Sequence, residues 1–157
     1  MHITKAMLEN FEEVKQITRN TISEIYPHYY PKGAVDFFLT HHRDENIRND
    51  ILSELVYLLT DNNEAIGTVT IKENEICRLF VLPKHQHKGA GSILLTFAEE
   101  LIAESYPEIC IDSSLPAKNL YLKRGYAVTE AHTILTENGD VLCYDRMVKT
   151  APVKIKN

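Results

Sequence analysis

Residues 77–95 read as a β-strand that runs into a short loop and then opens a helix. The strand is predicted over 75–82, the loop carries Gly89 and Gly91, and apolar residues recur at helical spacing over 93–102. Glycines in such a loop let the backbone approach a ligand closely. The first N–H groups of the helix are free donors at the positive end of its dipole. The segment therefore predicts an anion site suited to a diphosphate, and the alternative is a tight connection that needs small residues.

Two familiar phosphate-binding loops do not fit this segment. A Walker A loop needs Gly, four residues and then Gly-Lys-Ser/Thr, which the chain lacks. The dinucleotide-binding fingerprint needs a third glycine where Leu94 stands. Lys84 and Lys88 add positive charge around the loop, in keeping with a diphosphate ligand.

Hydrophobic periodicity and turn signals predict an α/β (α+β) fold around a mixed, mostly antiparallel sheet of six to seven strands with helices on both faces. We expect strands at 2–6, 55–60, 65–72, 75–82, 108–112, 126–136 and 141–148, and helices at 9–26, 93–102, 116–124 and, as one or two segments, within 33–53. Gly125 is expected as a left-handed cap. We expect one domain over 1–150 and a frayed tail over 151–157.

Composition narrows the classes of function. The net charge of -5 argues against a nucleic-acid-binding role, because such proteins usually carry a basic face. No apolar run has membrane-spanning length, and the chain begins without a signal-peptide pattern, so we expect a cytoplasmic protein that binds no membrane. Cys77, Cys110 and Cys143 are scattered, which favours a reducing compartment and buried, inert thiols in apolar strands.

Two motifs in order resemble the GNAT superfamily of acetyl-CoA-dependent N-acetyltransferases. Gln86-His-Lys-Gly89-Ala-Gly91 is similar to the family's Gln/Arg-x-x-Gly-x-Gly/Ala, and the stretch from Ser114 to Tyr126 is similar to its Asn-x-x-Ala-x-x-Leu-Tyr-x-x-x-Gly-Phe. The resemblance implies a GNAT-like fold and transfer of an acetyl group from acetyl-CoA, as co-substrate, to a primary amine of a small molecule or peptide by direct attack. It also implies a possible homodimer.

The resemblance assigns cofactor-binding residues as well. The backbone of Leu79, Phe80 and Val81 would hold the pantetheine arm and supply the oxyanion donor. Ser114 stands where the family often has Asn, and Asn119 is a nearby substitute. The diphosphate would be held by the loop residues Gln86, His87, Lys88, Gly89, Ala90, Gly91 and Ser92.

Two residues are candidates for proton transfer. Tyr121 falls where the family has its tyrosine, so the resemblance makes it the general acid for the leaving thiolate; a packing role beside Leu120 is the alternative. Glu75 begins the strand that leads to the loop and is the candidate base, acting directly or through water. Its alternative is a solvated charge at a strand start, with Glu73 as the fallback base.

The histidines show no spacing typical of a zinc site, so we expect no metal. His41 and His42 are adjacent, so their rings are expected to point apart on a helix. Either could line the acceptor pocket together with Tyr26, Tyr29 and Tyr30, or the tyrosines could instead cap the core.

The sequence is also compatible with two other functions. One is a non-catalytic acyl-CoA-binding sensor or regulatory module of the same fold, and the other is an interaction domain without a cofactor. The acceptor is also open among polyamine, amino acid, antibiotic amine, peptide N-terminus and lysine side chain, although the acidic charge balance slightly favours a cationic one.

Overall fold

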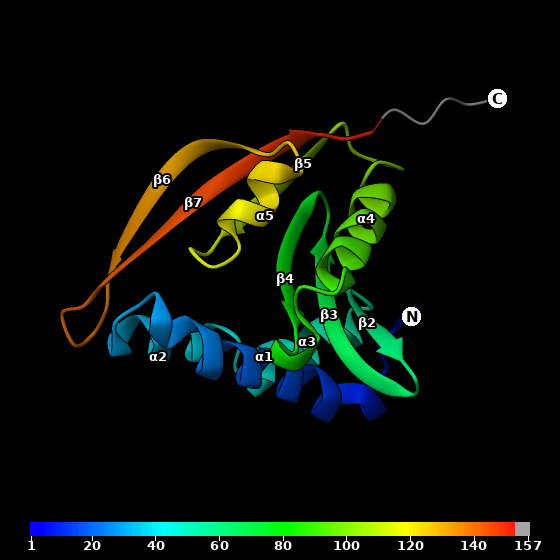
Figure 1. Ribbon diagram of the computed structural model, residues 1–157, viewed down its shortest axis with the longest axis horizontal. Helices are drawn as coiled ribbons and strands as arrows, with labels where there is room; N and C mark the ends of the chain where they lie inside the picture. Colours follow the sequence, from blue (N-terminus) through cyan, green and yellow to red (C-terminus); the bar gives the residue numbers. More distant parts are fainter. Residues whose placement is uncertain (153–157) are drawn as a thin grey trace.

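The computed structural model describes residues 1–152, and seven strands form one mixed sheet in the order β1-β2-β3-β4-β5-β7-β6 (Figure 1). Every neighbouring pair is antiparallel except β4 and β5. The strands are β1 (His2–Lys5), β2 (Val56–Asp61), β3 (Glu64–Lys72), β4 (Glu75–Val81), β5 (Glu108–Ser113), β6 (Ala127–Leu135) and β7 (Val141–Thr150).

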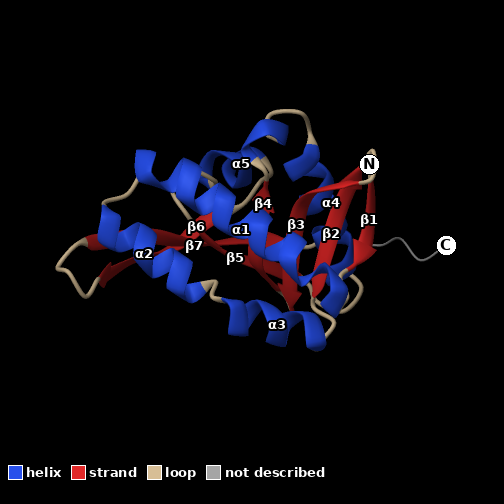
Figure 2. Ribbon diagram, turned by 90° about the horizontal axis from the view of Figure 1, so that it is seen from below, coloured by secondary structure: helices blue, strands red, loops and turns tan. Residues whose placement is uncertain are grey.

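Helices cover both faces of the sheet. The helices are α1 (Phe11–Ile25), α2 (Lys32–His41), α3 (Asp44–Leu52), α4 (Ala90–Ile102) and α5 (Lys118–Lys123). Seen from below, α1, α2 and α3 lie in front of the sheet (Figure 2). Helix α1 contacts β3 and β4, and α4 packs on β3, β4 and β5 from the other side.

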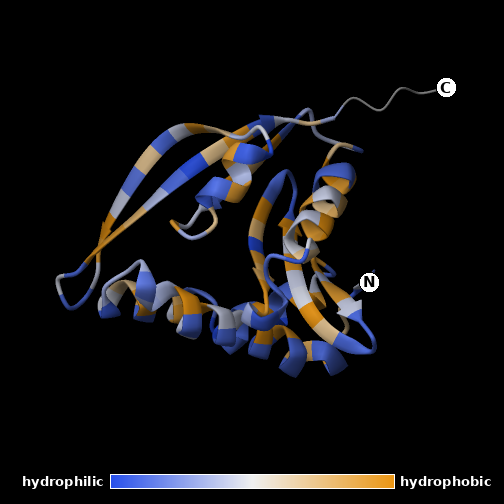
Figure 3. Cartoon of the chain, viewed as in Figure 1, coloured by the Kyte–Doolittle hydropathy of each residue, from blue (hydrophilic) through white to orange (hydrophobic). Residues whose placement is uncertain are grey.

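Two apolar cores lie on the two faces of the sheet. One joins α4 to the sheet through residues such as Ile66, Leu94 and Ile109, and the other joins α1–α3 to it through residues such as Ile22 and Ile47. Both exist because the strands alternate their side chains between faces and the helices present one apolar stripe each. In Figure 3, hydrophilic and hydrophobic bands alternate along the β6–β7 hairpin. Most residues of β6 are exposed.

A β-bulge in β4 changes which face its side chains point to. Thr70 pairs with Arg78 and the next residue, Ile71, pairs with Ile76, so Cys77 is left without a partner. One extra residue in one strand shifts the alternation by one position. Glu75, before the bulge, and Arg78, after it, therefore point to the same side of the sheet, the side of α1–α3.

The parallel strands β4 and β5 pair only where they begin. Glu75 pairs with Cys110 and Ile76 with Ile111, and no later residue of β4 pairs with β5. Beyond this point the two strands separate, as Figure 1 shows. The interior of the sheet thus contains an opening flanked by strand edges whose backbone groups are not used in the ladder.

The β6–β7 hairpin arches away from the sheet, and its tip meets the start of α2 (Figure 1). The Gly33 N–H donates to Oδ2 of Asp140 at 2.8 Å, and the Asn138 side chain donates to the same oxygen at 2.9 Å. A Cβ atom on Gly33 would overlap the side chain of Asn138 and force that side chain out of its place in this contact. We call this contact the hairpin latch.

The predicted α/β fold is confirmed, with element bounds that differ by a few residues at most. Two helices fill 33–53, and Gly125 has the left-handed conformation expected of it, with φ of 89°. Ala151, assigned to the tail, is buried and donates its N–H to the Pro107 carbonyl, while 153–157 lie outside the described residues. Within residues 1–152, the helices are too short or too polar to cross a bilayer.

Two local expectations were wrong. The rings of His41 and His42 meet edge to face with centroids 4.9 Å apart, because α2 ends at His41 and His42 leaves the helical conformation. The cysteines were expected to be buried, yet Cys143 is exposed, because it lies on an outward position of the open hairpin.

Candidate active site

A cavity of about 630 Å³ opens where β4 and β5 separate. Its walls come from α1, α2, β4, the loop before α4, the segment around α5, and the hairpin. Of the predicted site residues, those that line it are Glu75, Leu79, Phe80, Val81, Gln86, His87, Gly89, Gly91, Ser92, Ser114 and Tyr121. Both sequence motifs therefore contribute to one cavity.

The loop before α4 is shaped by two residues with positive φ. Gly89 is left-handed with φ of 89° and caps α4, and His87 has φ of 60°. The Ile93 N–H donates to the Gly89 carbonyl at 3.0 Å, which is the first hydrogen bond of helix α4. The N–H groups of residues 90–92, which come before it in the helix, have no helical carbonyl to donate to and are free for a ligand. The Gln86 side chain donates to the Val81 carbonyl at 3.0 Å and braces the loop. These features make an anion site at the cavity mouth.

Among the residues predicted for cofactor binding or proton transfer, four do not line the cavity. Lys88 is exposed and donates its ammonium to the Lys84 carbonyl, whereas Ala90 is buried under the loop. Asn119 is exposed on α5, and Glu73 is exposed in the turn before β4. Any part of Ala90 in ligand binding falls to its backbone N–H.

Tyr121 belongs to α5 and lines the cavity. Its side chain is buried, and its ring contacts that of Tyr126 with centroids 5.7 Å apart. Burial raises the pKa of the Tyr121 phenol, because the phenolate would lose its solvation. The hydroxyl is therefore protonated at neutral pH and available as a hydrogen-bond donor.

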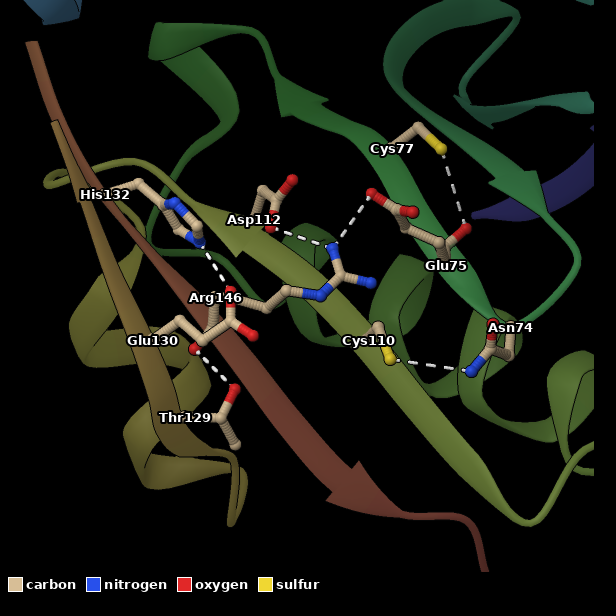
Figure 4. Close-up of polar contacts among 9 residues, drawn as sticks. All are labelled: Asn74, Glu75, Cys77, Cys110, Asp112, Thr129, Glu130, His132 and Arg146. Atoms are coloured by element: carbon tan, nitrogen blue, oxygen red, sulfur yellow. Dashed lines mark hydrogen bonds and ion pairs between the residues drawn. The ribbon is translucent and has the colours of Figure 1, made fainter. Parts of the chain in front are cut away.

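Glu75 belongs to a charged row that crosses three strands. Arg146 on β7 lies 2.9 Å from the Asp112 carboxylate and 3.6 Å from that of Glu75. Figure 4 shows the Arg146 side chain reaching over β5 between the two acids. Ion pairing raises the pKa of Arg146, with the Asp112 hydrogen bond as the largest favourable contribution against desolvation. Glu75 is thus a tethered, half-exposed carboxylate in the cavity wall.

Cys77, the bulged residue, also lines the cavity. Its sulfur lies 3.8 Å from the Glu75 carbonyl, an interaction drawn in Figure 4. Burial raises the pKa of the Cys77 thiol to about 11, and the Glu75 charge adds to the shift. The neutral thiol is a poor nucleophile at physiological pH.

Arg78 and His42, which line the cavity, belong to a buried polar network that the sequence analysis did not predict. The Arg78 guanidinium donates to Oδ2 of Asp50 at 3.1 Å, to the Thr70 hydroxyl at 2.8 Å and to Nδ1 of His42 at 3.3 Å. Asp50 also pairs with Lys72 at 2.8 Å. An arginine inside an otherwise apolar strand was the available signal, since such a charge is rarely buried without partners.

Aromatic side chains from the end of α1 and from α2 form another part of the cavity wall. Tyr26, Phe37, Phe38 and His41 line it, as does His42, whereas Tyr29 and Tyr30 do not. Burial lowers the pKa of His41 and lowers that of His42 to about 2, with Arg78 as the next cause for both.

Tyr30 instead ties three elements together. Its hydroxyl accepts from the Leu115 N–H at 2.7 Å and lies 3.4 Å from the Cys143 carbonyl, to which it donates. These bonds hold the α1–α2 connection against β7 and the segment before α5. Tyr30 therefore fixes the frame of the cavity without contributing to its surface.

Metal ligation finds no support in the described part of the chain. Residues 1–152 contain no group of three or more His, Cys, Asp or Glu side chains close enough to hold an ion.

Comparison with known proteins agrees with this geometry. A family model described as an acetyltransferase (GNAT) domain matches residues 25–140. Among solved structures, a GCN5-related N-acetyltransferase from Rhodopseudomonas palustris superposes with a TM-score of 0.86 at 20% identity, covering 95% of this chain and 94% of that one.

Other solved structures share the fold at similarly low identity. The PaiA N-acetyltransferase from Thermoplasma acidophilum, in complex with coenzyme A, has a TM-score of 0.75 at 21% identity, with 95% and 98% covered. A ribosomal-protein-alanine N-acetyltransferase from Escherichia coli has a TM-score of 0.65 at 15% identity, with 99% and 97% covered.

Proposed function

The chain belongs to the family of GNAT acetyltransferases, and from this premise we propose that it transfers an acetyl group from acetyl-CoA to a primary amine of a small molecule or peptide. One observation carries the proposal. A single cavity joins the anion-binding loop at Gly89 and Gly91 to a buried phenol, Tyr121, and a carboxylate, Glu75. We further propose that residues 1–150 act as one domain.

The loop end of the cavity suits the diphosphate of coenzyme A. Free N–H groups at the start of α4 and the left-handed Gly89 offer donors to phosphate oxygens, with no side chain in the way. From there the unpaired edge of β4 leads inward past Leu79, Phe80 and Val81. Their backbone groups would hold the pantetheine arm, and Ser114 would contact it from the opposite side.

The reaction is aminolysis of a thioester. The acceptor arrives as an ammonium, with a pKa near ~10, and has no lone pair until it loses a proton. Glu75 would take that proton, directly or through a water molecule. The amine nitrogen then bonds to the thioester carbonyl carbon and releases its second proton to water. The carbonyl oxygen, now negative, accepts a hydrogen bond from a backbone N–H of β4.

Collapse of this intermediate breaks the carbon–sulfur bond. The departing sulfur takes a proton from the Tyr121 hydroxyl, which recovers it from solvent, and the products are the acetylated amine and free coenzyme A. The raised pKa of Tyr121 supports this role in one respect, because the phenol is protonated before the reaction begins.

Direct attack of the amine on the thioester, without an acetylated cysteine, fits the protonated state of the Cys77 thiol. This thiol is the nucleophile closest to Glu75 in the cavity wall, but its pKa of about 11 leaves little thiolate at neutral pH. An acetyl-cysteine intermediate is therefore disfavoured, and Cys77→Ala is expected to keep turnover.

An acyl-CoA-binding sensor is the second candidate, because the loop alone would suffice for binding. The buried phenol and the tethered carboxylate in the same cavity favour the enzyme. The test is release of coenzyme A thiol from acetyl-CoA in the presence of a panel of primary amines. Turnover that falls in Tyr121→Phe supports the enzyme; acetyl-CoA binding without turnover of any amine would support the sensor.

A further inference from the structure

His42 lines the acceptor side of the cavity without a part in the proposed chemistry. Its side chain is 7% exposed, and its ring meets that of Phe80 edge to face, with centroids 5.5 Å apart. Phe80 belongs to the segment of β4 proposed to hold the thioester. A group bound by His42 would therefore lie close to the attacked carbonyl.

The neighbouring arginine fixes which ring nitrogen carries the proton. Arg78 Nε lies 3.3 Å from Nδ1 of His42. A guanidinium has donors and no acceptor, so the imidazole nitrogen that faces it must be unprotonated. In the neutral ring the proton then resides on Nε2. A second proton would have to enter at Nδ1, against the guanidinium, so His42 is a fixed donor and not a base.

The arginine itself is held in place. Its other two nitrogens donate to Thr70 and Asp50, both buried. Arg78 is thus a positioning residue for His42. The imidazole has no other hydrogen-bond partner among residues 1–152, so Nε2 is the ring nitrogen left for a ligand in the cavity that His42 lines.

Charge around the cavity is divided between two sides. Glu75 and Asp112 line the cavity near the start of β4, where they suit an ammonium. His42 and Arg78 line it farther along β4 and offer hydrogen-bond donors, whereas Lys72, the cross-strand partner of Glu75, pairs with Asp50. A ligand with a cationic amine and an oxygen acceptor a few bonds away matches both sides.

We infer that the Nε2–H of His42 binds a carbonyl or carboxylate oxygen α to the acceptor's amine, so that the acceptor is an α-amino carbonyl compound: an amino acid, its amide or a short peptide N-terminus. This inference rests on the proposed function and names its acceptor class. The aromatic wall of Tyr26, Phe37 and Phe38 favours an apolar side chain on that compound. A simple polyamine lacks the oxygen that would satisfy His42.

The kinetic test uses amines that differ only in the α substituent. Phenethylamine, L-phenylalaninamide, L-phenylalanine and phenylalanylglycine share one ring and one amine. Their kcat/KM values are compared in wild type, His42→Phe and His42→Gln. Gln can accept from Arg78 through its oxygen and donate to the ligand through its nitrogen, whereas Phe can do neither.

The preference of wild type for L-phenylalaninamide over phenethylamine is expected to fall by about tenfold in His42→Phe, the size of one hydrogen bond in a desolvated site, and to persist in His42→Gln. The lower amine pKa of the amide acts equally in all three proteins, so the change in the ratio reports the contact. The kcat/KM values of L-phenylalanine and phenylalanylglycine show whether a carboxylate oxygen or a peptide carbonyl oxygen is preferred. An unchanged ratio in a folded, active His42→Phe protein would overturn the inference while leaving the proposed function intact.

A second readout does not depend on turnover. Nitrogen-15 spectra of the imidazole are expected to show the neutral Nε2–H tautomer, with an Nε2 shift that moves when N-acetyl-L-phenylalaninamide is added and not when N-acetylphenethylamine is added. An Nδ1–H tautomer, or no response to the amide at saturation, would refute the inference. Failure of every amine to release coenzyme A would instead count against the proposed function.

Discussion

At the scale of single residues, neighbouring charged groups and burial set the protonation states of the side chains in the site. Arg78 turns His42 into a donor, and Arg146 holds the Glu75 carboxylate in the cavity wall. Burial keeps the Tyr121 phenol and the Cys77 thiol protonated. In the proposed reaction, His42 and Tyr121 would therefore donate hydrogen bonds to the ligands, and Glu75 would accept a proton.

The lowered pKa of His42 makes stability depend on pH. The folded pKa is about 2, against 6.5 for an ordinary histidine, so below pH 6.5 the unfolded chain binds a proton that the folded chain does not. The stability that the neutral His42 ring gives to the folded chain is therefore fully present above pH 6.5. It is lost as the pH falls below that value, and the slope of the loss approaches about 1.4 kcal/mol per pH unit.

Urea unfolding at several pH values between neutral and mildly acidic measures this loss. The free energy of unfolding of wild type should fall more steeply toward acid than that of His42→Gln, which has no titrating ring. Parallel curves for the two proteins would mean that His42 is protonated freely in the folded state.

Tyr121→Phe tests the acid role with little change in shape. The ring contact with Tyr126 is kept, and only the hydroxyl is removed. We expect kcat to fall by about 100-fold, within the usual range for proton transfer, with acetyl-CoA affinity unchanged. Steady-state kinetics and calorimetry measure the two quantities, and an unaltered kcat would assign Tyr121 to packing.

At the scale of elements, the bulge in β4 shows where sequence reasoning stops. The strand 75–82 was predicted closely, yet strict alternation would place Glu75 and Arg78 on opposite faces. The unpaired Cys77 places them on one face instead. A bulge depends on how the neighbouring strand is paired, which a local pattern does not encode. For the same reason the cluster of Arg78, Asp50 and His42, drawn from three elements, could not be predicted.

The hairpin latch offers a prediction at the same scale. Asp140→Ala removes the acceptor for the Gly33 N–H at the start of α2 and for the Asn138 side chain. We expect a loss of about 1 kcal/mol in the free energy of unfolding, as for other helix N-terminal caps, and a higher KM for the amine, because the hairpin carries Ile134 and Tyr144 of the cavity wall.

Glu137→Ala, a change at an exposed residue of the same turn, is the matched control. Thermal unfolding and amine kinetics compare the three proteins. If Asp140→Ala and Glu137→Ala were indistinguishable from wild type in both measurements, the latch would have no part in shaping the acceptor side.

At the scale of the whole molecule, the two halves of the sheet have different roles, one in the packed core and one in the cavity wall. The half formed by β1 to β4 packs against helices on both faces, and the half formed by β5, β7 and β6 contributes Ile134 and Tyr144 to the acceptor side. The fold class, the sheet and the loop could be predicted, because periodicity and the two motifs are local. The separation of β4 from β5, which makes the cavity, is a property of long-range pairing.

The most direct test of the account is a calorimetric titration of wild type and Gly91→Glu with acetyl-CoA. A Cβ at Gly91 would meet only Leu120, at 3.7 Å, so the variant should fold, while its carboxylate would occupy the diphosphate site. Leu135→Glu, at a residue 72% exposed on β6, makes the same change of charge elsewhere. We predict saturable 1:1 binding in wild type and Leu135→Glu and its loss in Gly91→Glu. Equal affinity in all three proteins, or no binding to wild type at millimolar acetyl-CoA, would contradict the account.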